Sequence, residues 1–232
     1  MNVRIAKFIA DSGATSRRGA EQLIESGAVT VNGKVITSPI FFVDGTEKIA
    51  VSGKIIKKDT NTVVYAFHKP INTMTTTHDP DGRRTIYDVL PQQYHKLKYV
   101  GRLDFKTTGL LLLTNDGALA RKLTLPSSGI LRTYIASVSG SDFSGLAQAR
   151  QGITVDGIHY RPMKIKILPD NQLHITVSEG KKNEIRIVLA ACGLPVRHLH
   201  RLSYGMVELG NLSPGKIKSV SQKTIDVMLK SF

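Results

Sequence analysis

The chain has 232 residues, of which 41% are apolar, and its 32 Lys and Arg exceed its 18 Asp and Glu to give a net charge of +14. No apolar run reaches the length of about 18 residues that a membrane-spanning helix needs, and one cysteine, Cys192, excludes an intramolecular disulfide and a cysteine-rich zinc site. The N-terminal segment lacks the layout of a secretory signal, so we expect a cytoplasmic protein. The net charge is compatible with a nucleic-acid partner or with a merely soluble surface. The distribution of the charge along the chain has to decide between these two interpretations.

The N-terminal part is predicted to be a small unit of two helices and a hairpin. Apolar residues recur at helical spacing from position 5 and stop at Gly13. Ser16 is placed to cap a second helix that ends at Gly27. Asn32-Gly33 lies between valine-rich runs and is typical of a hairpin turn, because both turn positions need φ > 0.

Residues 1–60 are expected to form one domain with its linker, and residues 61–232 a larger α+β domain on a mixed, mainly antiparallel sheet. The linker is expected in the polar stretch 54–61. The first domain carries a net charge of +3 and the second +11, so the excess is not a basic tail. The expected strands of the second domain cover 63–67, 134–138, 163–168 and 173–177, and the expected helices about 117–124, 142–150 and 182–192.

Two arginines, Arg17 and Arg18, fall in the first turn of the second predicted helix. The helix dipole disfavours cations there, so a fold selected only for stability would more often carry Asp or Glu. A bound phosphate reverses this preference, since free backbone N–H groups and two arginines would together form an anion site. A pair of solvated arginines is the alternative, and the residues alone leave both open.

The same stretch resembles a known RNA-binding domain. The segments IAKFIA (5–10), SRR (16–18) and VTVNG (29–33) are similar to the domain named after ribosomal protein S4, over about residues 2–50. The resemblance implies a small α/β fold that binds RNA, with Arg17 and Arg18 among its RNA contacts. It implies no reaction, because this domain occurs in proteins of several functions.

The most unusual segment is GRLDFKTTGLLLLTNDG, residues 101–117. Its four consecutive leucines fit a strand buried on both faces at the centre of the sheet. Just before them, Asp104 follows a glycine in a loop that could present a carboxylate at the edge of a rigid strand. An aspartate near a glycine can also cap a turn, and the residues alone favour that interpretation. Asp116 is expected to be the N-cap of the next helix.

Over nearly the whole chain, the order of the motifs resembles that of the bacterial ribosomal-RNA pseudouridine synthases. These motifs are HKP (68–70), TTHDP (76–80) with Gly82-Arg83, YVGRLD (99–104), RTY (132–134), EGKKNEIR (179–186), and then Val196, Leu199, Arg201 and Gly205. The resemblance implies an enzyme that breaks the bond from ribose to uracil N1, turns the base and rejoins it through C5, with no cofactor. It also implies that Asp104 is the catalytic nucleophile.

Further roles follow from the same resemblance. Arg186 would pair with a partly buried Asp104 and keep it ionised, because burial alone would raise the pKa of that carboxylate. Tyr134 would stack on the extruded base, and Arg102 would fill the space that the base leaves or hold a phosphate. Leu199 would line the base pocket. Without the family, Arg186 is the polar side of an amphipathic helix, Tyr134 a sheet residue and Leu199 part of the core.

The chain departs from the family pattern at several positions. Lys182 and Arg201 remain expected RNA contacts, but residues 181–187 read KKNEIRI where the family usually has RNRQVRR. Glu184 and Ile187 thus replace an amide and a cation, which puts the RNA contacts of that helix in doubt. Phe105 stands where tyrosine is common.

The His198-x-His200 pair could suggest a metal, but no third ligand is in view and arginines lie on both sides, so we expect no metal site.

The substrate is expected to be ribosomal RNA, with 23S rRNA favoured over 16S rRNA, and the activity would contribute to rRNA modification and ribosome maturation. We expect a monomer with no cofactor and no membrane partner. One alternative is a ribosome-binding module without activity, in which the first domain and the basic surface do everything. Another is an enzyme acting on tRNA, which is less favoured because dedicated tRNA relatives mostly lack the N-terminal domain.

Overall fold

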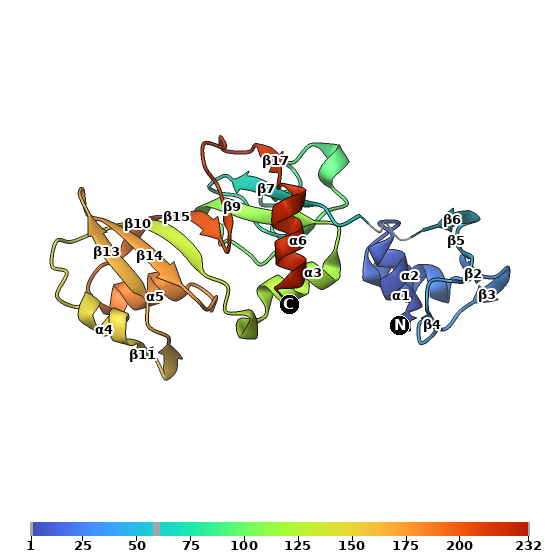
Figure 1. Ribbon diagram of the computed structural model, residues 1–232, viewed down its shortest axis with the longest axis horizontal. Helices are drawn as coiled ribbons and strands as arrows, with labels where there is room; N and C mark the ends of the chain where they lie inside the picture. Colours follow the sequence, from blue (N-terminus) through green and yellow to red (C-terminus); the bar gives the residue numbers. More distant parts are fainter. Residues whose placement is uncertain (1, 58–60, 232) are drawn as a thin grey trace. The chain divides into compact units, whose positions relative to one another are not determined.

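The computed structural model describes residues 2–57 and 61–231 and separates into two compact units. One unit comprises residues 1–62 with Asn115–Gly117, and the other comprises residues 63–114 and 118–232 (Figure 1). The expected linker, 54–61, is partly wrong, because Lys54–Ile56 form strand β6 of a sheet, while 58–60 lie outside the described residues. Within the described ranges, no helix is both long and apolar enough to cross a membrane.

The first unit packs two helices against short antiparallel strands, with a core that includes Ile5, Ile9, Ile24 and Ile49. The sheet order is β3-β2-β5-β6, and β1 pairs with β4. The elements are β1 (Val3–Arg4), α1 (Ile5–Asp11), α2 (Arg17–Glu25), β2 (Val29–Val31), β3 (Lys34–Ile36), β4 (Phe42–Val43), β5 (Ile49–Val51) and β6 (Lys54–Ile56).

Local signals in this unit act as predicted. The Ser16 hydroxyl accepts a hydrogen bond from the backbone N–H of Gly19 at 3.1 Å and so caps α2. Asn32 and Gly33 both have positive φ, 49° and 82°, in the turn between β2 and β3. The predicted helices and hairpin of the first 36 residues are therefore confirmed.

The second unit is built on a nine-stranded sheet of order β13-β14-β10-β15-β9-β7-β17, with β16 added to β15 and β8 to β9. Among the described strands of this sheet, β9 and β15 pair in parallel and the other pairs are antiparallel. The mixed, mainly antiparallel α+β fold is thus confirmed. The strands are β7 (Val64–Lys69), β8 (Lys98–Val100), β9 (Thr107–Thr114), β10 (Arg132–Val138), β13 (Lys164–Leu168), β14 (Gln172–Val177), β15 (Val196–Tyr204), β16 (Val207–Glu208) and β17 (Ile217–Ser219), with β11 (Ile153–Val155) and β12 (Ile158–Tyr160) as a separate hairpin.

Helices cover both faces of this sheet. Those of the second part of the chain are α3 (Gly117–Thr124), α4 (Leu146–Gln151), α5 (Glu184–Ala191) and α6 (Gln222–Lys230), with the short 3-10 turns η1 (Gln92–Tyr94) and η2 (Pro126–Ser128). Apolar residues of α3 and α6 share one core cluster, while α4 and α5 contribute to another, on the side of β10, β13 and β14 (Figure 1).

Two helix starts differ from the prediction. Helix α4 begins at Leu146, because Asp142 accepts a hydrogen bond from Ser144 N at 2.9 Å and forms a turn first. Helix α5 begins at Glu184, because Asn183 before it adopts a left-handed conformation with φ 54°.

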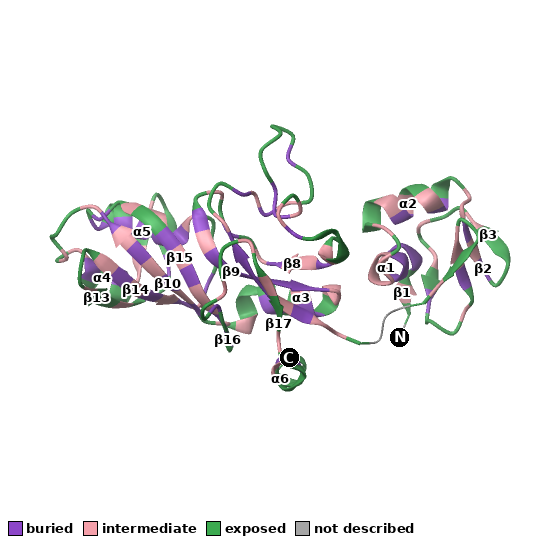
Figure 2. Ribbon diagram, turned by 90° about the horizontal axis from the view of Figure 1, so that it is seen from above, coloured by how far each residue is buried: buried purple, intermediate pink, exposed green. Residues whose placement is uncertain are grey.

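Strand β9 lies at the centre of the sheet between β7 and β15. Leu111 and Leu113 pack into one core cluster and Leu110 and Leu112 into the other, and all four are fully buried (Figure 2). The prediction of a central strand buried on both faces is confirmed. This strand fixes the position of the loop that precedes it, which carries Asp104.

Gly109 allows β9 and β15 to approach. It has φ +103°, and a Cβ at this position would lie 2.3 Å from the backbone oxygen of Arg201. The register pairs Gly109 with Arg201 and Thr107 with Leu199. A glycine is therefore required where the two strands that carry most of the site meet.

Candidate active site

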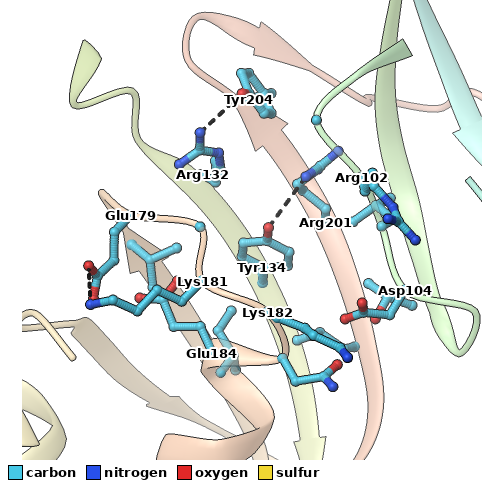
Figure 3. Close-up of a pocket in the computed structure, with 18 of the residues that line it drawn as sticks. Arg102, Asp104, Arg132, Tyr134, Glu179, Lys181, Lys182, Glu184, Arg201 and Tyr204 are labelled. Atoms are coloured by element: carbon cyan, nitrogen blue, oxygen red, sulfur yellow. Dashed lines mark hydrogen bonds and ion pairs between the residues drawn. The ribbon is translucent and has the colours of Figure 1, made fainter. Parts of the chain in front are cut away.

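A cavity of about 650 Å³ opens in the second unit beside the Asp104 loop. Its walls come from the loop 101–104, the start of β9, strands β10 and β15, and the segment 179–185 that leads into α5 (Figure 3). These parts are far apart in sequence, and the pairing of β15 with both β9 and β10 brings them together. The cavity unites six expected site residues: Arg102, Asp104, Tyr134, Lys182, Leu199 and Arg201.

Asp104 is exposed at this cavity, and Figure 3 shows its carboxylate directed toward the segment that carries Lys182. In the described part of the chain, no residue donates a hydrogen bond to this carboxylate or forms an ion pair with it. The expectation of a partly buried aspartate is therefore wrong for the free chain. The carboxylate is exposed and open to a ligand.

The expected pair of Arg186 with Asp104 is not formed in this structure. Arg186 is half-buried and donates to the backbone oxygens of Val196, at 3.1 Å, and Lys106, at 3.4 Å. Burial lowers the pKa of Arg186, and the negative charge of Asp104 opposes this effect. Backbone carbonyls thus hold the Arg186 guanidinium near the Asp104 loop. The charge of Asp104 affects its pKa, but the two side chains do not form an ion pair.

Tyr134 and Arg201 form the inner wall. They face each other across β10 and β15, and Arg201 Nη1 donates to the Tyr134 hydroxyl at 3.4 Å (Figure 3). Arg201 is 2% exposed, its Nε donates to Leu110 O at 2.6 Å, and its guanidinium lies 5.1 Å from the centre of the Tyr204 ring. Arg201 therefore supports the tyrosine from inside and does not lie on the outer surface.

Two buried polar atoms of the cavity lining lack a partner within the described chain: Nη2 of Arg201 and the hydroxyl of Thr107. A buried polar atom without a hydrogen bond costs about 1–3 kcal/mol. Such atoms are suited to contact a polar ligand that enters the cavity. Thr107 lies within the segment 101–117, but nothing in the sequence assigned a role to its side chain.

The remaining candidates differ in exposure. Arg102 and Lys182 are exposed cations on two sides of the cavity, and Figure 3 shows both near Asp104. Leu199 is 6% exposed and belongs to the core while also lining the cavity, and its contact with a base stays a prediction. Arg17 and Arg18 belong to the first unit, where they are exposed in the first turn of α2.

Lys69 is a buried cation near Asp104 whose surroundings the sequence did not show. It is fully buried at the end of β7, and its Nζ donates to the backbone oxygens of Pro70, at 2.9 Å, and Thr73, at 2.7 Å. Burial lowers its pKa to about 8, although the charge of Asp104 acts to raise it. Lys69 belongs to the HKP motif, but a lysine that bonds only to carbonyls leaves no pattern in sequence.

Glu184 lines the cavity and is buried beside another carboxylate, that of Glu179. It is 5% exposed, and its carboxyl group hydrogen-bonds that of Glu179. Burial raises the pKa of Glu184 to about 7, with a further contribution from the charge of Glu179. Burial would also raise the pKa of Glu179, but hydrogen bonds from Lys181 Nζ and Arg161 N, both at 2.7 Å, hold it below its ordinary value. Glu184 thus replaces the amide of the family pattern with a group that can still donate when protonated.

The two histidines of the His198-x-His200 pair lie in different environments. His198 is exposed, whereas His200 Nδ1 hydrogen-bonds Thr108 Oγ1 at 2.8 Å and its ring lies edge-on to His68 at 5.3 Å. Burial lowers the pKa of His200, and His68 adds to this. Over residues 2–57 and 61–231, no three His, Cys, Asp or Glu side chains gather as metal ligands.

Comparisons with known proteins agree on one family. The family model for RNA pseudouridylate synthase matches residues 63–191, and that for the S4 domain matches residues 3–49. An uncharacterized RNA pseudouridine synthase from Rickettsia conorii is 38% identical over 227 residues, which cover 96% of this chain and 98% of the relative. The ribosomal large subunit pseudouridine synthase B of Bacillus subtilis is 34% identical, with 94% and 92% covered.

A solved structure extends the agreement to the fold. A crystal structure of a pseudouridylate synthase matches with a TM-score of 0.71 at 28% identity, covering 97% of this chain and 99% of the other. The chain therefore belongs to the RNA pseudouridine synthase family, isomerases that act on RNA, and carries an S4 domain ahead of the synthase domain.

Proposed function

We propose that this protein converts a specific uridine of ribosomal RNA to pseudouridine, with large-subunit rRNA as the favoured substrate. The observation that carries the proposal is Asp104, a carboxylate without a partner in the described chain, at a cavity whose inner wall is Tyr134. The similarity to a Bacillus subtilis enzyme named for the large ribosomal subunit supports the choice of RNA.

The proposed reaction balances without a co-reactant. The bond from ribose C1′ to uracil N1 breaks and a bond from C1′ to C5 forms, while C5 loses a proton and N1 gains one. No electrons are gained or lost overall. The protein has to supply an ionised carboxylate near the sugar and base, a place for the extruded base, and a route for the proton.

Asp104 is the proposed nucleophile. In the free chain its carboxylate is exposed to solvent. Bound RNA would cover the carboxylate, and the nearby positive charges of Arg186 and Lys69 would then attract it more strongly. The ion pair of Arg186 with Asp104, which the free chain lacks, would then form in the complex with RNA.

The base would lie against Tyr134, because stacking on an aromatic ring recovers about 1–3 kcal/mol of the cost of extruding it. Leu199 supplies the apolar side of the pocket, while the unpaired atoms of Thr107 and Arg201 await polar groups of the nucleotide. Arg102 and Lys182 would contact flanking phosphates at the opening. The S4 domain would add phosphate contacts through Arg17 and Arg18.

The test is to incubate the purified chain with 23S rRNA, 16S rRNA and tRNA transcripts and to map pseudouridine in each. We expect one modified position in 23S rRNA. Modification of 16S rRNA or tRNA alone would overturn the proposed substrate, and no modification of any RNA would overturn the activity. The proposal includes a monomer that acts in the cytoplasm, where bacterial ribosomal RNA is made.

A further inference from the structure

The position of Asp104 depends on its backbone, because its side chain makes no hydrogen bond or ion pair within the described chain. A nucleophile must lie within a few tenths of an ångström of its productive position, and a displacement of about 1 Å can cost about a hundredfold in rate. Something must therefore fix the main chain on both sides of Asp104.

The segment 72–75, which follows β7, makes these contacts. The Thr75 hydroxyl donates to Leu103 O at 2.8 Å and accepts from Leu103 N at 3.2 Å. Asn72 N donates to Phe105 O at 2.9 Å. The residue before Asp104 and the residue after it are thus both bonded to one short segment.

Thr75 is the central contact of this arrangement. It is 1% exposed, and its hydroxyl hydrogen-bonds both backbone polar groups of Leu103, the N–H and the carbonyl, although the two residues are 28 positions apart in sequence. Without the hydroxyl, a buried N–H and a buried carbonyl would lose their partner, so the loop would shift to regain water.

The segment itself is held firmly, so it can act as a reference for the loop. Lys69 Nζ donates to Thr73 O. Met74 N donates to Arg84 O at 2.8 Å, and Met74 O accepts from Ile86 N at 2.9 Å. A side chain that bonds a rigid segment to the loop transmits that rigidity to Asp104.

We propose that Thr75 is a positioning residue that clamps the backbone of Leu103 and thereby sets the position of the Asp104 carboxylate. This inference rests on the proposed function of Asp104. Thr75 does not touch substrate; it acts through the main chain. The clamp predicts that the hydroxyl affects the rate of the chemical step and not the affinity for RNA.

The main comparison is Thr75→Ala with Thr75→Ser. These two variants lack the same methyl group and differ by one oxygen atom, so their difference reports the hydroxyl. Thr114→Ala and Thr114→Ser are the matched controls: Thr114 is fully buried at the other end of β9, and its hydroxyl also donates to a carbonyl, that of Val63, at 2.7 Å.

Single-turnover rates at saturating protein, RNA affinity and melting temperature are measured for all four variants. We expect Thr75→Ala to be about ten- to a hundredfold slower than Thr75→Ser. We expect equal RNA affinity within about twofold and no such rate ratio for the Thr114 pair. Equal rates for the Thr75 pair, or the same ratio for both pairs, would overturn the inference.

Hydrogen–deuterium exchange of the peptide 101–106 gives a readout independent of activity. The Leu103 amide should exchange faster in Thr75→Ala than in Thr75→Ser, and equal exchange would show that there is no clamp. If the wild-type chain forms no pseudouridine, the proposed function fails, and the exchange comparison still decides whether Thr75 holds the loop.

Discussion

The Asp104 carboxylate is exposed, while the two nearby cations that act on it are held apart from it. The carboxylate is exposed in the free chain, whereas Arg186 and Lys69 are held behind the loop by backbone carbonyls. These two cations bond to carbonyls and to no carboxylate of the described chain, so their charge can act on Asp104 nearby. A tight ion pair in the free chain would instead occupy the carboxylate before a ligand arrives.

Glu184 leads to a prediction about pH. The ordinary pKa of a glutamate, 4.5, applies to the unfolded chain, and the folded chain raises it to about 7. Because the folded state binds this proton more tightly, its contribution to stability is complete below pH 4.5 and is lost as the pH rises to about 7. The loss should be about 1–3 kcal/mol.

The Glu184→Gln variant keeps a donor at all pH values and should not suffer this loss. The variant's melting temperature minus that of the wild type should therefore rise from pH 4.5 to about 7 and stay constant above. Glu208→Gln, at an exposed glutamate of the same unit, should show no such rise. If the melting-temperature difference instead fell with pH, Glu184 would be stabilised in its ionised form. The nearby cations that could do this are Lys181, Arg161 and Arg132, which lies beside Gly180.

Some residues of the candidate site could be predicted from sequence and others could not. Asp104, Tyr134 and Leu199 belong to motifs with a fixed order along the chain, and the structure brings them to one cavity. Lys69 and Thr75 bond to main-chain atoms, which every sequence has, so no residue pattern marks their partners.

At the scale of elements, the parallel contact of β9 with β15 holds the site together. It joins the strand after Asp104 to the strand that carries Leu199 and Arg201. Gly109 permits this contact, since any Cβ there would overlap the Arg201 backbone. The close approach is what lets Arg201 Nε reach the carbonyl of Leu110.

Gly109→Ala should therefore be severely destabilising. The free energy of unfolding should fall by more than about 3 kcal/mol, because a backbone clash adds to the strain of a positive φ. Gly157→Ala is the control: φ is +76°, with no atom within 4 Å of the added Cβ, so only strain remains, about 1–2 kcal/mol. Denaturant unfolding measures both, and equal losses would show that β9 and β15 do not need this glycine.

Local signals predicted elements well, and non-local pairing limited the rest. The cap at Ser16, the Asn32-Gly33 turn and the leucine strand depend on neighbours in sequence, and all three are confirmed. Strand β15 was missed because its buried residues include Arg201, which a hydrophobic pattern does not count. Helix α6 was missed as well, and sheet order could not be read from one strand at a time. The N-cap role of Asp116 stays a prediction, although its Oδ2 accepts from Thr62 Oγ1 at 3.1 Å.

For the whole molecule, the net charge of +14 has two parts. The first 60 residues carry +3 and the rest carry +11, so both units can contact a polyanion. Neither share of the charge lies in a basic tail, because the family models match a folded S4 domain in one unit and a synthase domain in the other.

The arginines of α2 test the contribution of the first unit. Arg17 lies 3.8 Å from Glu21, an exposed pair that adds little to stability, so both arginines are available for phosphate. Changing Arg17 and Arg18 to Ala should weaken RNA binding and lower the slope of log K against log salt by about 0.7–0.9 per lost contact. The measurement is RNA affinity at several salt concentrations, and an unchanged slope would mean that these arginines are only solvated surface.

The most direct test of the account is pseudouridine formation by the Asp104→Asn variant. With 23S rRNA as substrate, we expect turnover to fall at least about 1,000-fold while RNA affinity stays within about twofold, because the amide keeps the shape but not the nucleophile. Asp156→Asn, the same change at an exposed aspartate of the same unit, should keep wild-type turnover. Wild-type turnover by Asp104→Asn would contradict the assignment of the nucleophile.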